Sequence, residues 1–226
     1  MNKNKQVSTK LMVLTAALTA MVVVLQLLGS FIHLGMFSIS LVLVPIVIGA
    51  AICGVGSGAW LGFAFGLAVL ISGDAAAFLA VDPFGTVVTV LAKGTAAGFV
   101  SGLIYKLFAE LCNSWKERAK PIKSEKLSKI RDLTLRYLPV LIAAIVCPVV
   151  NTGVFLIGCN LFFYSTLSEW AKAFGYENAA KYMIFGLAGG NFLFELLFNV
   201  FLSPTIVRVL DLFSNKFRNK RVSNTN

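Results

Sequence analysis

Residues 11–32 read LMVLTAALTAMVVVLQLLGSFI, and no side chain in this run is charged. About 20 apolar residues in a helix cross the ~30 Å hydrocarbon core of a bilayer, so this run predicts a transmembrane helix. The rest of the chain has the same character, because 58% of its residues are hydrophobic and only 13% are charged. Five more apolar runs follow, at 38–53, 57–72, 85–108, 136–160 and 182–207. Backbone polar groups in lipid must be satisfied within the chain. The sequence therefore predicts an all-α membrane protein with six transmembrane helices.

Basic residues are distributed unequally between the two sides of such a bundle. One side receives both termini, the turn near Gly54 and the segment 109–135, and it carries most of the Lys and Arg residues. The loops of the other side contain only Lys172 and Lys181 as basic residues. The positive-inside rule then predicts that both termini are cytoplasmic. The net charge of +10 indicates attraction to anionic membrane lipid, not to nucleic acid.

The expected organisation has three parts. Residues 1–10 form a cytoplasmic N-terminus, residues 11–213 form the six-helix transmembrane domain, and residues 214–226 form a cytoplasmic basic tail. A cytoplasmic basic linker, 109–135, interrupts the transmembrane domain.

Several kinds of site have no support in the sequence. No G-x-x-x-x-G-K-[ST] motif occurs, so the chain does not bind ATP through a P-loop. The four cysteines lack metal-ligand spacing, and His33 is the single histidine. We find no paired carboxylates and no Ser/His/Asp set directed at one place. The sequence therefore predicts neither an enzyme nor a bound metal or cofactor.

Small residues recur at every fourth position in three of the predicted spans, which allows helices to approach closely in lipid. They are Ala16 and Ala20 in the first span, Gly58, Gly62 and Gly66 in the third, and Gly94, Gly98 and Gly102 in the fourth. We interpret the two glycine series as internal packing faces. The alanine pair is in a span of Leu, Val and Met, and it could equally dock a partner helix.

Polar side chains within the predicted spans mark a candidate site, because such groups usually face an interior cavity. Lys93, Asn151 and Asn191 come from three different spans, and Lys93 is about 13 Å below the outer end of its span. Glu195 follows Asn191 by one turn and shares its helix face. Two interpretations remain open: a Lys93–Glu195 ion pair that joins two helices, or a substrate site in which Lys93 binds an anionic group.

With these motifs in order, the chain resembles the substrate-binding S component of an energy-coupling factor (ECF) vitamin transporter. The stretches that carry the resemblance are LTAALTA at 14–20, LVPIVIGA at 43–50, GAWLGFAFG at 58–66, DPF at 82–84 with KGTAAG at 93–98, and PVVNT at 148–152. They cover nearly all of the predicted membrane region.

The resemblance implies a subunit of the prokaryotic plasma membrane that captures a vitamin or related micronutrient at the outer face. It implies docking of the Ala16/Ala20 face on a transmembrane coupling protein with two cytoplasmic ATPase subunits. It also favours Lys93, Asn151 and Asn191 as ligand contacts, and the subgroup most like this chain suggests pantothenate, with folate and other vitamins open. The alternatives are a stand-alone ion-coupled transporter and a membrane-embedded enzyme.

Overall fold

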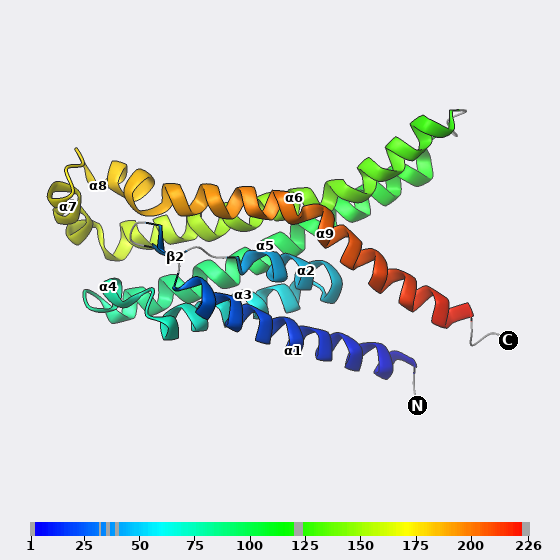
Figure 1. Ribbon diagram of the computed structural model, residues 1–226, viewed down its shortest axis with the longest axis horizontal. Helices are drawn as coiled ribbons and strands as arrows, with labels where there is room; N and C mark the ends of the chain where they lie inside the picture. The colour runs from blue at the N-terminus through cyan, green and yellow to red at the C-terminus, as the bar shows by residue number, and fades with distance from the viewer. Residues whose placement is uncertain (1–2, 32, 35–36, 39–40, 120–123, 223–226) are drawn as a thin grey trace.

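The computed structural model describes residues 3–31, 33–34, 37–38, 41–119 and 124–222 (Figure 1). The elements are, in chain order, α1 (Lys3–Gly29), β1 (His33–Leu34), β2 (Phe37–Ser38), α2 (Leu43–Cys53), α3 (Val55–Ser72), α4 (Ala76–Leu79), α5 (Pro83–Arg118), α6 (Glu125–Phe162), α7 (Tyr164–Ala173), α8 (Ala179–Lys181), the π-helical segment η1 (Tyr182–Ala188) and α9 (Gly189–Val222). The strands β1 and β2 are two residues each and pair antiparallel.

Long apolar helices dominate the described part of the chain. Within it, five helices are long and apolar enough to cross a membrane: α1, α3, α5, α6 and the continuous run Ala179–Leu210. Helix α2 is apolar but shorter, with 11 residues. This confirms the predicted all-α membrane bundle of about six helices.

Helix α2 is the buried centre of this bundle. At 1.5 Å per residue it is about 16 Å long, which is well short of the hydrocarbon core. It packs against α1, α3, α5 and α9, and Leu43, Ile46 and Val47 are almost completely buried. The predicted span 38–53 is therefore helical from Leu43 onward, while residues 39–40 lie outside the described residues.

The two glycine series face each other between α3 and α5. A Cβ atom added at Gly62 would collide with the backbone carbonyl of Gly94, and one added at Gly98 would collide with the carbonyl of Gly58. Only glycine lets the two backbones come this close, and such contacts replace the hydrophobic driving force that lipid does not provide. The prediction that these series are internal packing faces is confirmed.

The two ends of the bundle carry different elements. Figure 1 shows both termini at one end, together with the C-terminal end of α5 and the N-terminal end of α6, whereas α4, α7 and α8 lie at the other. Helices α5 and α6 have 36 and 38 residues. At 1.5 Å per residue each exceeds 50 Å, roughly 20 Å more than the hydrocarbon core requires.

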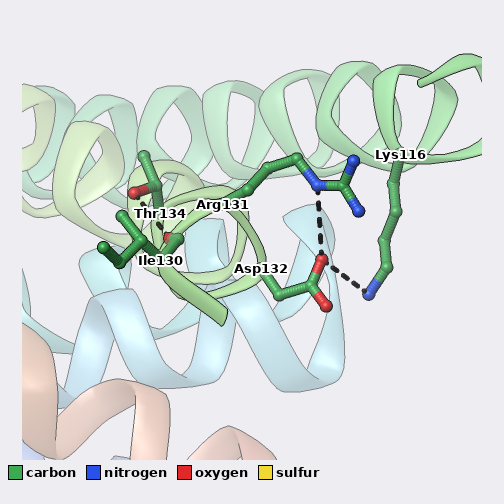
Figure 2. Close-up of polar contacts among 5 residues, drawn as sticks. All are labelled: Lys116, Ile130, Arg131, Asp132 and Thr134. Atoms are coloured by element: carbon green, nitrogen blue, oxygen red, sulfur yellow. Dashed lines mark hydrogen bonds and ion pairs between the residues drawn. The ribbon is translucent and has the colours of Figure 1, made fainter. Parts of the chain in front are cut away.

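The predicted linker 109–135 is therefore largely a helical extension of α5 and α6, with residues 120–123 outside the described residues. Figure 2 shows how Asp132 on α6 connects the two helical extensions. Its Oδ1 atom lies 3.5 Å from Lys116 Nζ on α5 and 3.8 Å from Arg131 Nε on α6. These groups are partly exposed, so each pair contributes at most about 1 kcal/mol.

An aromatic cluster closes the end that carries α4 and α7. The ring of Phe78 packs edge-on against Phe155, Phe163 and Trp170, with centroid distances of 5.9, 5.0 and 5.7 Å. Leu167 on the amphipathic α7 is fully buried beneath it. Helices α4, α6 and α7 are thereby joined over one end of the bundle.

Candidate substrate-binding site

A cavity lies directly beneath this aromatic cluster. Its empty volume, including the part open to solvent, is about 550 Å³. Seven of the fourteen residues that line it are polar and seven are apolar. The lining residues are Gln26, Phe65, Val69, Asp74, Ala75, Phe78, Thr86, Thr89, Val90, Lys93, Phe155, Phe163, Asn191 and Glu195.

Lys93 supplies the ammonium group of this cavity. It is ten residues into α5, about 15 Å along the helix from Pro83. Its Nζ lies 5.1 Å from the ring centroid of Phe155 and 5.8 Å from that of Phe65, which are cation–π distances. Among the residues that the structure describes, Nζ has no hydrogen-bond acceptor and no ion pair within 4.0 Å. Its three N–H donors therefore remain available to a molecule in the cavity.

Glu195 is held by two asparagines instead of by Lys93. Asn151 Nδ2 on α6 donates to Glu195 Oε2 at 3.4 Å, and Asn191 Nδ2 donates to Oε1 at 3.1 Å. Asn191 is one turn before Glu195 on α9, and Asn199 one turn after it donates to the Glu195 carbonyl at 2.8 Å. The side chain of Glu195 is almost completely buried. Its carboxylate therefore has hydrogen-bond partners without the lysine.

The four predicted site residues converge, but not equally. Lys93, Asn191 and Glu195 line the cavity, whereas Asn151 is behind Glu195 and reaches the cavity only through that hydrogen bond. The segment η1 immediately precedes α9 and ends at Ala188, three residues before Asn191. Such π-helical turns interrupt an α-helix and often occur beside functional sites.

Four polar cavity residues were missed by the sequence analysis: Gln26, Asp74, Thr86 and Thr89. Gln26 on α1 is 2% exposed, and its Nε2 donates to Asp74 Oδ2 at 2.5 Å. Ser72 Oγ donates to the same oxygen at 3.1 Å. The sequence could have indicated Gln26, since it is an amide inside an otherwise apolar run. It could not have indicated Asp74, because a carboxylate in a predicted loop is ordinary.

Buried polar atoms without partners also surround the cavity. Within the described part of the chain, Thr89 Oγ1 and Asn191 Oδ1 are buried and lack a hydrogen-bond partner. Most buried polar groups in proteins are paired, so these two need explanation.

The predicted docking residues are on a different surface. Ala16 and Ala20 are both exposed on α1, while Leu18 and Val22 of the same helix are buried in the core. Helix α1 is fixed to α3 by Thr15 Oγ1, which lies 3.3 Å from Ser57 Oγ, and by Trp60 Nε1, which donates to Thr19 Oγ1 at 3.2 Å. Figure 1 shows α1 at the edge of the bundle. One helix therefore carries both the exposed alanine face and, through Gln26, part of the cavity wall.

The groups that line the cavity are suited to holding a small molecule. Among the described residues, no group of three or more His, Cys, Asp or Glu side chains is arranged to hold a metal ion. The cavity combines one ammonium, two carboxyl groups and aromatic walls, which suits a small polar molecule with an apolar part.

Comparisons with known proteins place this arrangement in a family. No curated protein and no solved structure matches this chain. The family model "ECF transporter, substrate-specific component" matches residues 10–207, which include the alanine face, the glycine series and every residue that lines the cavity. The chain therefore belongs to the family of substrate-specific components of ECF transporters.

Proposed function

We propose that this protein captures an anionic vitamin or related micronutrient in the cavity and passes it to an ATP-driven transport complex. The family consists of transporter subunits that associate with an ECF module, a coupling protein with ATPases, and that bind a small molecule.

One observation carries the anionic assignment. The ammonium of Lys93 borders the cavity with aromatic rings as its contacts and with no acceptor among the described residues. A charged group at membrane depth is costly unless it has a partner, and a ligand carboxylate would supply that partner. The rival interpretation, a structural ion pair with Glu195, is weakened because Glu195 accepts its hydrogen bonds from Asn151 and Asn191.

In this proposal Lys93 binds the anionic group, Asn191 and Glu195 contact the polar body of the ligand, and Asn151 orients Glu195. Pantothenate is the first candidate, since it combines a carboxylate with an amide and two hydroxyl groups. Folate and other carboxylate-bearing vitamins are the next ones to test.

Topology and docking follow the charge and the exposed small residues. The end with both termini and the basic α5–α6 extension is proposed as cytoplasmic, which puts the cavity on the outer side of a prokaryotic plasma membrane. The three-part organisation, with the N-terminus at 1–10, the transmembrane domain at 11–213 and the tail at 214–226, is kept as part of the proposal. The exposed Ala16/Ala20 face is proposed to dock on the coupling protein, because small residues permit close helix contact.

Affinity purification from native membranes tests the proposal. We expect the tagged protein to bring a membrane coupling protein, two ATPase subunits and a small carboxylate, all identifiable by mass spectrometry. A stand-alone ion-coupled transporter or a membrane-embedded enzyme would bring no ATPase. Recovery of the chain without ATPases under conditions that preserve other membrane complexes would contradict the proposal.

A further inference from the structure

Glu195 is a buried carboxylate that has no basic group as a direct partner in the part of the chain that the structure describes. It is 1% exposed, and no described Lys, Arg or His nitrogen lies within 4.0 Å of its oxygens. The two oxygens instead accept N–H groups from Asn151, at 3.4 Å, and from Asn191, at 3.1 Å. Neutral amides solvate a carboxylate but do not cancel its charge, and an uncompensated charge at membrane depth is costly.

The same two asparagines carry buried oxygens, Asn151 Oδ1 and Asn191 Oδ1, that have no hydrogen-bond partner among the described residues. Asn151 as a whole is 4% exposed. The nitrogen and oxygen of a carboxamide are about 2.3 Å apart, so both amide oxygens lie within about 6 Å of the Glu195 carboxylate. Buried polar groups normally have a partner. Four oxygens from three side chains, one on α6 and two on α9, are therefore gathered in one buried place.

This set of oxygens fits a small hard cation, because carboxylate and amide oxygens are the ligands that such ions prefer. Na⁺–oxygen contacts are about 2.4 Å, like those of Ca²⁺, so two ligand oxygens at right angles on one ion are about 3.4 Å apart. The amide nitrogens of Asn151 and Asn191 lie 3.4 and 3.1 Å from the carboxylate oxygens. A half-turn of each amide exchanges its nitrogen with its oxygen, since the two ends have the same shape, and gives the oxygens this spacing.

The charges on the spanning helices favour a monovalent ion. Lys93 on α5 and Glu195 on α9 both line the cavity, with one charge each. A carboxylate bound at Lys93 adds a negative charge and leaves Glu195 unbalanced. One monovalent cation restores neutrality, whereas a divalent ion would leave an excess positive charge. A monovalent ion held by one carboxylate and neutral oxygens does not require the cluster of three or more His, Cys, Asp or Glu side chains that the described residues lack.

From this arrangement we infer that an alkali-metal cation, with Na⁺ as the first candidate, binds between Glu195, Asn151 and Asn191, and that it binds cooperatively with the anionic group at Lys93. The cooperativity rests on the proposed function, since it takes Lys93 as the site of the anion. The ligands of the cation do not depend on that assignment. The cation is a co-ligand of the binding step, and the energy for transport still comes from the ATPases.

Thermal unfolding of the purified protein in lipid nanodiscs tests the cation alone. Choline chloride is replaced by NaCl or KCl at constant ionic strength, because choline is too large to be held by these oxygens. We expect Na⁺ or K⁺ to raise the unfolding midpoint with a saturable dose response. Glu195→Gln should abolish this response at nearly constant size, and Asn151→Ala should weaken it. Glu177→Gln is the matched control, since Glu177 pairs with Lys181 and does not line the cavity, and its response should equal that of the wild type.

Isothermal titration tests the cooperativity. The affinities of pantothenate, folate and biotin, three carboxylates, are measured in NaCl, KCl and choline chloride. We expect the tightest of the three to bind at least about tenfold more tightly with the effective cation than in choline, which is within the usual range of coupling between two sites. Reciprocity then requires the cation to bind more tightly by the same factor when that carboxylate is present.

The outcomes separate this inference from the proposed function. Unfolding midpoints and carboxylate affinities that are the same in all three salts, or a cation response that persists in Glu195→Gln, overturn the inference and leave the proposed function intact. A cation response without carboxylate binding in any salt supports the cation site but overturns the anionic site, and with it the cooperativity. Co-purification of the ATPases tests the family role separately.

Discussion

Replacement of Lys93 by alanine separates a ligand contact from a structural ion pair. In the structure the ammonium contacts the rings of Phe155 and Phe65, at 5.1 and 5.8 Å from their centroids. Such cation–π contacts contribute about 0.5–2 kcal/mol each. Glu195 keeps both of its asparagine hydrogen bonds when the lysine is removed. Lys93→Ala should therefore destabilise the empty protein by roughly 1–4 kcal/mol in total.

The expected loss of affinity is larger. Truncation of one partner of a desolvated charge pair costs about 2–5 kcal/mol, and about 1.4 kcal/mol corresponds to a tenfold change. Lys93→Ala should thus weaken the binding of a carboxylate ligand by about 30-fold to about 4,000-fold.

Thermal unfolding and titration with the tightest-binding carboxylate measure the two effects on the same preparations. The double variant Lys93→Ala, Glu195→Gln is the control, because removal of both charges relieves any stranded carboxylate. We expect it to bind as weakly as Lys93→Ala. A double variant with near-wild-type affinity would refute the ligand contact. Stability lost in Lys93→Ala and restored in the double variant would show that Lys93 also stabilises Glu195.

Three further predictions concern docking, helix packing and the aromatic cluster. Ala16→Trp with Ala20→Trp should abolish cellular uptake, while the ligand affinity measured by titration stays intact. The control Phe201→Trp, on the exposed surface of α9, should change neither uptake nor affinity. If the double tryptophan variant still assembles with its partners and transports, the docking face is wrong. Gly62→Ala should lower thermal stability by about 1–3 kcal/mol or more, because the added Cβ meets the Gly94 carbonyl. The control Gly153→Ala, with open space around the added Cβ, should be neutral or slightly stabilising. Equal stability of the two variants would contradict the α3–α5 packing. Phe78→Ala should lower the free energy of unfolding by about 3–5 kcal/mol, since this ring joins α4, α6 and α7 above the cavity. It should also speed ligand release in stopped-flow experiments. An unchanged release rate would show that the aromatic cluster does not close the site.

Much of the fold could be predicted because composition and small-residue spacing act locally. The spacing of Gly58, Gly62 and Gly66 indicates a face that permits close approach, and that face does pack against the matching face of α5. The length of α2 could not be predicted, since an apolar run does not reveal where its helix begins. The helical extensions beyond Phe108 were also missed, because their charges identify an aqueous segment but do not exclude a helix.

The candidate site could be predicted only for residues that are unusual within their own stretch of sequence. Lys93 and Glu195 stand out as ionisable groups in apolar runs. The contacts between them depend on which helices are neighbours: Asn151 and Glu195 are 44 residues apart, and Gln26 and Asp74 are 48 residues apart. A single sequence does not indicate such pairs, so the contribution of Gln26 and Asp74 to the cavity became visible only with the helices assembled.

Reconstituted transport tests the central claim most directly. The protein is placed in proteoliposomes with the coupling protein and ATPases that co-purify with it, and uptake of the radiolabelled carboxylate that it binds is measured with and without ATP. The account predicts that uptake requires ATP and all partners, and that Lys93→Ala abolishes it at ligand concentrations near the wild-type Kd. Uptake by the chain alone, driven by an ion gradient and independent of ATP, would contradict it.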